Sequence, residues 1–213
     1  MSSVLIMTAI LISTFGALWV ATLPEQSIVE RNAVVFGTSL VGALIVWGLL
    51  VGVLQTGIYP SIEVGIAALK WKLTLDPLGL TYGVIASTLW VFAAIYSFGY
   101  LSGDQRQRQY FTFFLLSAGI TLGIAFAGNL FTLYLFYELL TFSTYPLVVH
   151  QGDKGALEAG TKYIKYSLVG ATFILAGLVT LWRITGGNLD FQTLPQVFPL
   201  ISTKQTVTLF FLF

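Results

Sequence analysis

The chain has no cysteine, a single histidine and few charged residues. Without cysteine it has no disulfide framework, no thiolate metal site and no cysteine nucleophile. One histidine, His150, is too few for a metal site built from histidines. Lysine and arginine number 10 against 9 aspartates and glutamates, and this net charge of +1 argues against a nucleic-acid surface.

Apolar sequence is what the chain has in abundance. Hydrophobic residues make up 56% and charged residues 9% of it, and the mean hydropathy is +0.86. A soluble domain has about a quarter charged residues. The composition therefore predicts an all-α integral membrane protein, a polytopic helix bundle. Apolar runs of membrane length predict six complete transmembrane helices, at residues 2–23, 33–55, 81–100, 109–127, 130–149 and 162–182.

Two segments depart from this pattern. Residues 56–80 contain Pro60, alternating polar and apolar residues at 69–73, and a turn at Asp76-Pro77, which predict an extended external loop. Residues 205–213 are apolar again and predict the start of a seventh helix, because nine residues cannot cross a bilayer. We expect a longer protein cut inside a span; the alternative is a separate polypeptide that supplies the remainder.

Glu138 is the most informative residue, because it stands alone in the middle of the apolar run 130–149. Twenty helical residues span about 30 Å, which places Glu138 within a turn of the bilayer midplane. An ionisable group there costs roughly 3 kcal/mol and marks an ion or proton path by default. The alternative is a neutral glutamic acid that only hydrogen-bonds a neighbouring helix.

Three polar residues accompany Glu138 along one side of this helix. At 100° per residue, Tyr134, Thr141 and Tyr145 fall within about 60° of it. Such a stripe predicts a face that points to the interior of the protein. Burial there favours the protonated carboxyl group, and a nearby cation favours the charged one. We therefore expect Glu138 to change its protonation state when a partner moves.

Lys162 and Lys165 are the candidate cations, and both lie at the start of the run 162–182. Glu158 lies one turn before Lys162, in the favourable order for an ion pair. Lys162 either extends to the membrane surface or reaches inward towards a proton entry route. His150, at the end of the preceding helix, is either a proton relay or a polar residue of the interface.

Basic residues in alternating loops predict the orientation. We call the side of the membrane that holds the N-terminus side X and the opposite side Y. The loops of side Y then hold Arg31, Arg106, Arg108, Lys154, Lys162 and Lys165, and those of side X hold Lys70, Lys72, Arg183 and Lys204. Side Y is therefore expected to be cytoplasmic, with the N-terminus outside the cell membrane.

Several motifs carry a family resemblance. They are NLFTLYLFYELLTFSTYPLVVH at 129–150, EAGTKY at 158–163, GGNLDF at 186–191, KLTLDPLGL at 72–80 and YSFGY at 96–100. This set resembles the antiporter-like proton-translocating subunits of respiratory complex I, membrane-bound hydrogenases and Mrp-type cation/proton antiporters. The last motif leans towards the D-type Mrp subunit.

The resemblance implies a fourteen-helix bundle with two inverted five-helix repeats, of which this chain holds an N-terminal part. Residues 1–108 would form helices one to three, and residues 109–213 an incomplete first repeat. Glu138 matches the fifth-helix glutamate of the family, whose usual partner is a lysine in the seventh helix, beyond Phe213. Lys162 resembles a lysine at the start of the sixth helix, whereas Lys165 has no counterpart.

The predicted function is proton translocation, alone or coupled to Na⁺, within a complex of several membrane subunits in the lipid bilayer. The chain offers no redox catalytic site, and neither a cofactor nor a nucleic-acid partner is expected. The alternative is a membrane scaffold that does not conduct. A quinone-reducing subunit has less support, because no cofactor ligands stand out. The sequence does not distinguish whether the chain belongs to a complex I, a membrane-bound hydrogenase or an Mrp antiporter.

Overall fold

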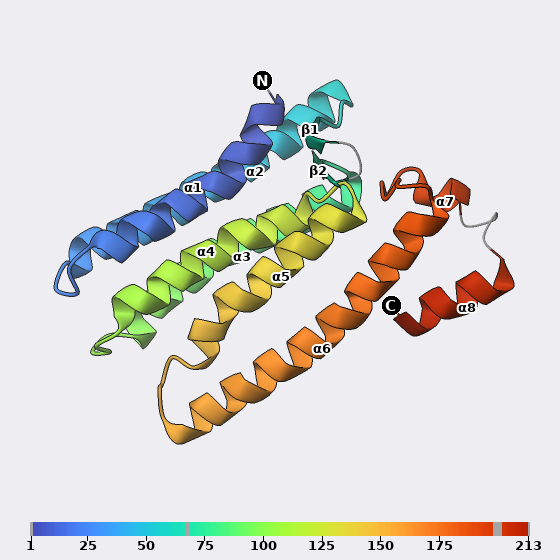
Figure 1. Cartoon of the computed structure of the whole chain (residues 1–213). Coiled ribbons are helices and arrows are strands. Elements are labelled where there is room, and N and C mark those ends of the chain that lie inside the picture. Colours follow the sequence, from blue (N-terminus) through green and yellow to red (C-terminus); the bar gives the residue numbers. More distant parts are fainter. Residues whose placement is uncertain (1, 67–68, 198–201, 213) are drawn as a thin grey trace.

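The computed structural model describes residues 2–66, 69–197 and 202–212. Within them, six long helices run side by side, with a β-hairpin at one end (Figure 1). The long helices are α1 Ser2–Thr22, α2 Ile28–Thr56, α3 Pro77–Tyr100, α4 Gln107–Ala125, α5 Leu130–Val148 and α6 Lys154–Ile184. The hairpin consists of β1 Ser61–Ile66 and β2 Leu69–Thr74, and the chain continues through α7 Leu194–Val197 and α8 Thr203–Leu212.

These helices confirm the predicted membrane architecture. Of the described helices, α1 from Ser3, α2, α3 and α6 are long and apolar enough to cross a membrane. Helices α4 and α5 have 19 residues each and lie alongside them, at the positions of the fourth and fifth predicted spans. Helix α8 begins where a seventh helix was predicted, although Phe213 lies outside the described residues. The predicted external loop at 56–80 contains the hairpin.

Side chains fix where three of the helices begin. Asp76, Asn129 and Asp153 accept hydrogen bonds from the backbone N–H groups three residues further on, at 2.6, 2.7 and 2.6 Å. These caps satisfy amide donors that a helix leaves free in its first turn. Pro77 follows the first cap, where its missing N–H costs nothing. Asn129 therefore marks the start of α5, the helix that carries Glu138.

Helices α1 to α4 form a packed bundle, and the later helices add to one side of it. Helix α1 packs against α2 and α4, α3 packs against α2 and α4, and α5, α6 and α8 follow in order. A Cβ at Gly119 would lie 2.7 Å from the carbonyl oxygen of Ile10, so glycine allows α4 to approach α1 closely. This packing crosses the division predicted at residue 108, which stays a prediction.

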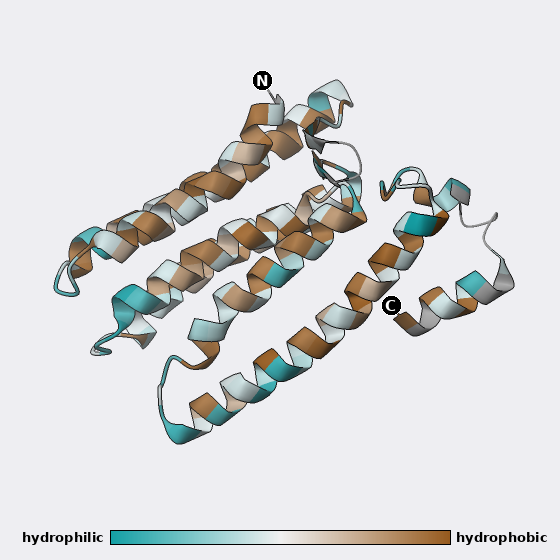
Figure 2. Cartoon of the chain, in the orientation of Figure 1, coloured by the Kyte–Doolittle hydropathy of each residue, from teal (hydrophilic) through white to brown (hydrophobic). Residues whose placement is uncertain are grey.

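The two ends of the bundle differ in their connections. Figure 1 shows the α1–α2, α3–α4 and α5–α6 connections at one end, which is side Y of the sequence analysis. The N-terminus, the hairpin, the α4–α5 turn and α7 lie at the opposite end, side X. Polar residues gather at both ends, whereas the helices between them are mostly apolar (Figure 2). This distribution fits a protein whose middle lies in hydrocarbon.

Candidate functional site

Glu138 lies near the midpoint of α5, and its carboxyl group is only partly satisfied by the protein. The residue is half-buried, but its Oε1 atom is buried and has no hydrogen-bond partner among the described residues. None of the described ion pairs includes it. An oxygen of this kind normally has a partner, because burying it without one costs about 1–3 kcal/mol.

The predicted polar stripe faces other helices. Tyr134 packs against a cluster that includes Leu178 and Leu181 of α6. Tyr145 lies close to Gly160, since a Cβ added there would come within 3.1 Å of the Tyr145 ring. Thr141 is buried and donates to the carbonyl oxygen of Tyr137 at 3.3 Å. The two tyrosines of the stripe therefore lie on the α6 side of α5.

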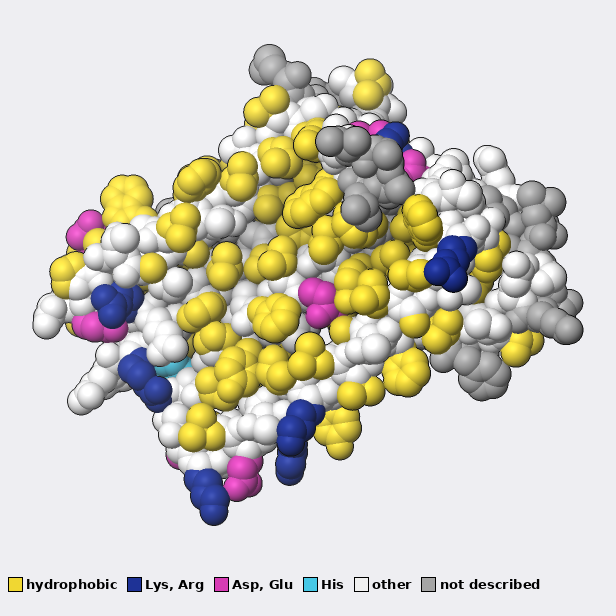
Figure 3. Space-filling model, in the orientation of Figure 1, with side chains coloured by type: hydrophobic (Ala, Val, Ile, Leu, Met, Phe, Trp, Pro, Cys, Tyr) yellow, Lys and Arg dark blue, Asp and Glu magenta, His cyan; other side chains and the backbone are white. Residues whose placement is uncertain are grey.

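The surface around this stripe is strongly apolar. Tyr137, Leu139 and Phe142 of α5 are exposed large hydrophobic residues. Figure 3 shows hydrophobic side chains over most of the visible face, with most lysines and arginines towards its edges. Glu138 is thus an acidic group in surroundings that offer it little polar compensation.

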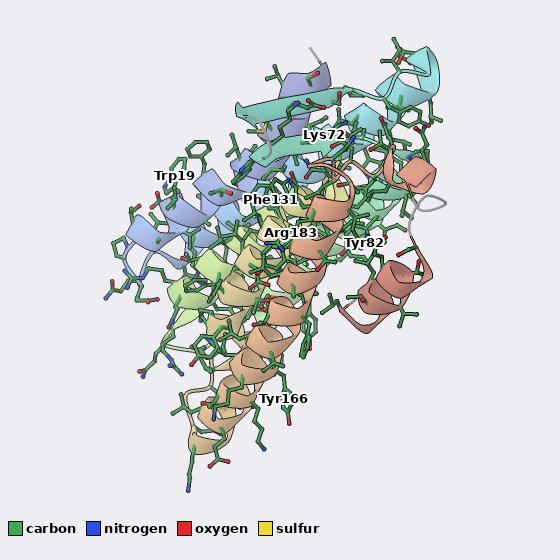
Figure 4. All side chains as sticks on the ribbon, turned by 45° about the vertical axis from the view of Figure 1, so that its right-hand side comes forward. Trp19, Lys72, Tyr82, Phe131, Tyr166 and Arg183 are labelled. Atoms are coloured by element: carbon green, nitrogen blue, oxygen red, sulfur yellow. The ribbon has the colours of Figure 1, made fainter. Side chains whose placement is uncertain are left out.

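The structure does not bring the candidate lysines to Glu138. Glu158, Lys162 and Lys165 are exposed on α6, where with Lys154 they line an open groove. The expected ion pair between Glu158 and Lys162 is not among the ion pairs of the described residues. Tyr166, next along this helix, is 79% exposed and points away from the bundle (Figure 4). Lys162 and Lys165 belong to the outer surface of α6 near side Y.

His150 follows α5 and contacts the α3–α4 connection. Its Nε2 lies 3.1 Å from Oδ2 of Asp104, and its ring packs edge-on against Tyr110. The backbone N–H of Arg106 donates to Asp104 at 2.6 Å. That bond, together with the nearby His150 and against the effect of burial, holds the pKa of Asp104 below its usual value. His150 is therefore tied to a carboxylate at side Y, about three turns from Glu138.

Arg31 departs from its predicted place in a loop. The structure puts it in the first turn of α2, where it is one of the largest fully buried side chains. Its guanidinium donates to the side-chain oxygen of Gln107 and lies 5.2 Å from the centre of the Phe111 ring. This contact joins α2 to α4 and has a packing role.

Lys72 is a buried charge that sequence reasoning did not single out. Its Nζ atom lies 2.8 Å from Asp190 and 3.2 Å from Glu63, and its side chain is only 10% exposed. Burial by itself lowers the pKa of Lys72, but hydrogen bonds and charges from Asp190 and Glu63 outweigh it, so the pKa lies above its ordinary value. We call these three residues the hairpin clamp.

The hairpin clamp holds the start of α5 through the backbone. The N–H of Lys72 donates to the Thr132 hydroxyl at 2.9 Å, and the N–H of Gly128 donates to the Lys72 carbonyl at 2.8 Å. The N–H of Leu130 donates to the carbonyl of Leu189 at 3.0 Å. Figure 4 shows Lys72 and Phe131, in the first turn of α5, towards the same end. A sequence signal existed, because Lys72 and Asp190 lie in two of the motifs.

Comparison with known proteins bears on this arrangement directly. The family model for the transmembrane region of NADH:quinone oxidoreductase and Mrp antiporters matches residues 127–213, which include all of α5 and α6. A second model, for the N-terminus of chain 5 of NADH-ubiquinone oxidoreductase (complex I), matches residues 62–111. Together the two models cover more than half of the chain. The chain belongs to the antiporter-like membrane subunit family.

Curated members of the antiporter-like family give the same result at lower coverage. The Na⁺/H⁺ antiporter subunit A1 of Staphylococcus aureus, in strains JH9 and Newman among others, is 31% identical over 114 residues. The match covers 53% of this chain and 14% of that subunit. The expected closeness to the D-type subunit stays a prediction.

The fold of an antiporter-like subunit is also found among solved structures. A chain of the membrane-bound sulfane sulfur reductase, described as an archaeal respiratory membrane complex, superposes with a TM-score of 0.80 at 20% identity. The superposition covers 96% of this chain and 32% of the other. The arrangement of α1 to α6 with the hairpin is therefore a shared fold. The two family models confirm the predicted family.

Proposed function

We propose that this chain is part of a membrane subunit that translocates protons, with Glu138 as the group that takes up and releases the proton. The observation that carries the proposal is the carboxyl oxygen of Glu138, which is buried without a described partner near the midpoint of α5. Family membership supports the same reading, since the S. aureus relatives are named as Na⁺/H⁺ antiporter subunits.

The proposed chemistry needs two states of one carboxyl group. In apolar surroundings the neutral, protonated group is favoured, because an unpaired buried charge costs far more than an unpaired neutral group. Approach of water or of a cation favours the charged state and releases the proton. An arrangement that alternates between these surroundings moves one proton per cycle. A carboxylate with a permanent cationic partner stays charged and does not alternate between these two states.

The remaining parts of the proposal concern partners and route. The subunit would work in a complex with other membrane subunits in the cell membrane, with Na⁺ as the coupled ion and the N-terminus outside. The side Y end, with its basic residues, would face the cytoplasm. His150 and Lys162 lie near that end, after α5 and in α6, and we assign them to the cytoplasmic part of the proton route. Lys165 and Glu158 are weaker candidates for the same part.

Replacement of Glu138 by glutamine in the intact complex tests the proposal. Glutamine keeps the shape of the side chain but carries no exchangeable acid proton. In inside-out membrane vesicles, Na⁺-dependent dissipation of a preformed pH gradient is expected to fall to background over the whole pH range. The matched control is Glu30→Gln, which removes an exposed carboxylate at the start of α2 and is expected to leave transport intact.

Two outcomes are decisive. Wild-type transport by the Glu138→Gln complex at every pH contradicts the proposal and favours the scaffold alternative. Labelling of Glu138 by a hydrophobic carbodiimide supports it, because a scaffold is expected to keep this carboxyl group dry and unreactive. Complex assembly, measured in the same membranes, separates loss of transport from loss of the protein.

A further inference from the structure

A small cavity lies inside the α1–α4 bundle. Its accessible volume is about 20 Å³, and all four helices line it. Its walls belong to a part of the protein that the proposed proton route does not use, because Glu138 lies on α5. The lining residues are Ser13, Ser39, Gly42, Ala43, Ala86, Ser87, Trp90, Ala118, Thr121 and Leu122.

Each of the four helices contributes one hydroxyl group to this cavity. Ser13, Ser39, Ser87 and Thr121 come from α1, α2, α3 and α4 in turn, and each is more than 90% buried. The Ser39 hydroxyl has no hydrogen-bond partner among the described residues. Ser87 has only a 3.3 Å bond to the Val84 carbonyl in its own helix. The cavity therefore holds unused hydrogen-bonding capacity in a region that is otherwise apolar.

The space itself results from small side chains. Gly42, Ala43, Ala86 and Ala118 line it where a typical helix–helix contact would place larger residues. Trp90 cannot satisfy the hydroxyls, because its indole N–H donates to the carbonyl of Phe114 at 3.2 Å. An apolar cavity of this size would stay dry, but a cavity with several polar groups is a site for bound water.

We propose that this cavity is a binding site for one water molecule, which joins α1, α2, α3 and α4 through their hydroxyl groups. The volume suffices, since a water needs about 10–15 Å³ on this measure and two to four polar partners. A cation does not fit the lining, because no lining residue carries a charge to offset its dehydration. The ligand is therefore neutral, and it can both donate to and accept from hydroxyls.

Helix α4 carries one hydroxyl group with a direct partner on another helix and one that faces the cavity. Ser117 contacts Ser143 of α5 directly, with 3.0 Å between the two hydroxyl oxygens. One turn along α4, Thr121 faces the cavity instead. In the proposal, a hydroxyl of α4 thus contacts α5 directly, and a second one reaches the hydroxyls of α1 to α3 through the water. Interhelical hydrogen bonds of this kind are a main source of adhesion between helices in a bilayer.

Radiolytic hydroxyl-radical labelling of the intact complex, read by mass spectrometry, tests for the water, because bound water generates radicals at its own position. Leu122, which lines the cavity, is 4% exposed, and Leu115 on the same helix is fully buried in a cluster outside the cavity. We expect oxidation of Leu122 and none of Leu115. Equal protection of the two leucines would overturn the proposal.

Two variants test whether the hydroxyls hold this water. Ser39→Ala removes the hydroxyl without a partner, and Gly42→Ala fills space, since its added Cβ would meet Ile12 and Ser13 at ordinary distances of 3.7 and 3.9 Å. We expect both to abolish the labelling of Leu122. The matched control is Gly37→Ala, also on α2, where an added Cβ meets nothing within 4 Å and labelling should persist.

The stability of the same variants distinguishes a wet cavity from a dry one. With water bound, Ser39→Ala loses a bridge and is expected to lower the melting temperature of the complex by about 2–4 °C. In a dry cavity the same change removes an unsatisfied hydroxyl, so a rise in melting temperature would contradict the proposal. Ser39→Ala should not change the pH profile of transport. Loss of transport in a Ser39→Ala complex of normal stability would contradict a purely structural role for the water.

Discussion

The hairpin end of the molecule and the middle of α5 each take an ionisable side chain out of water. At the hairpin end, Lys72 meets two carboxylates within 3.2 Å. In the middle of α5, Glu138 has no described partner for its buried oxygen. Both residues lie in segments that match the family models, so the difference lies in what the fold provides for each charge.

The difference separates a compensated charge from an ionisable group without a described partner. Lys72 and its carboxylates join the hairpin to Asp190, 118 positions further along the chain, and their charges compensate each other. Such a group resists any change of protonation. A carboxyl group without a fixed partner is poorly stabilised in either state, and for that reason it responds when water or a cation approaches.

The largest expected effect is that of Glu138→Gln on transport. A group that transfers a proton typically contributes about 10²–10⁴-fold to rate, so at least about a hundredfold loss is expected. The melting temperature of the complex should change little, because glutamine, like the neutral glutamic acid it replaces, buries no charge. A variant that transports normally, or that fails to assemble, would remove the contrast with Lys72.

Replacement of Lys72 by methionine should show the opposite pattern. The change leaves Asp190 without its cation and Glu63 with only the more distant Lys70, at 3.9 Å, and is expected to cost about 1.5–3 kcal/mol of stability. Both carboxylates keep some contact with water, at 44% and 29% exposure, so the cost stays below that of a fully enclosed pair. Thermal unfolding measures the loss, and transport per assembled complex should change less than about twofold.

Alkaline pH should reproduce the effect of that substitution. The folded-state pKa of Lys72 is raised above its ordinary 10.5, so its contribution is fully present below that pH. The contribution is lost as pH rises through the higher folded-state value. The difference in melting temperature between wild type and Lys72→Met should therefore shrink above about pH 10.5. Lys70→Met, which removes an exposed lysine from the same strand, should show no such convergence.

The smallest effects are expected at side Y. Lys162→Gln and His150→Gln should each slow transport by about two- to fivefold, because water can replace a relay group near the surface. Initial rates of gradient dissipation measure this, with Lys154→Gln as the exposed control on the same helix. A loss as large as that of Glu138→Gln would place the decisive group at side Y instead.

Periodicity and apolar run length predicted most of the fold. The six predicted spans correspond to α1 to α6, and the alternating residues at 69–73 lie in β2. Local caps such as Asp76-Pro77 are also visible in the sequence, since capping uses neighbouring residues. The prediction of a loop at Arg31 was wrong. A charged residue at the boundary of a span looks polar in the sequence whether its charged group is buried or exposed in the structure.

The site was predictable in part. The stripe of Tyr134, Glu138, Thr141 and Tyr145 follows from helical spacing alone, and its two tyrosines lie on the α6 side of α5. The surroundings of Lys162 did not follow, because a sequence shows a residue's position along a helix but not what covers that face. The partnership of Lys72 with Asp190 joins residues 118 positions apart, which no local pattern encodes.

The sequence by itself determined the membrane class, the helices, the family and the place of Glu138 within α5, because each rests on the order and spacing of apolar and polar residues along one chain. Only the tertiary structure decided which charges are compensated and which hydroxyls share a cavity. These depend on how separate helices approach each other, and that approach is set by packing over the whole bundle. Burial therefore leaves Lys72 paired with two carboxylates, whereas the buried oxygen of Glu138 has no described partner.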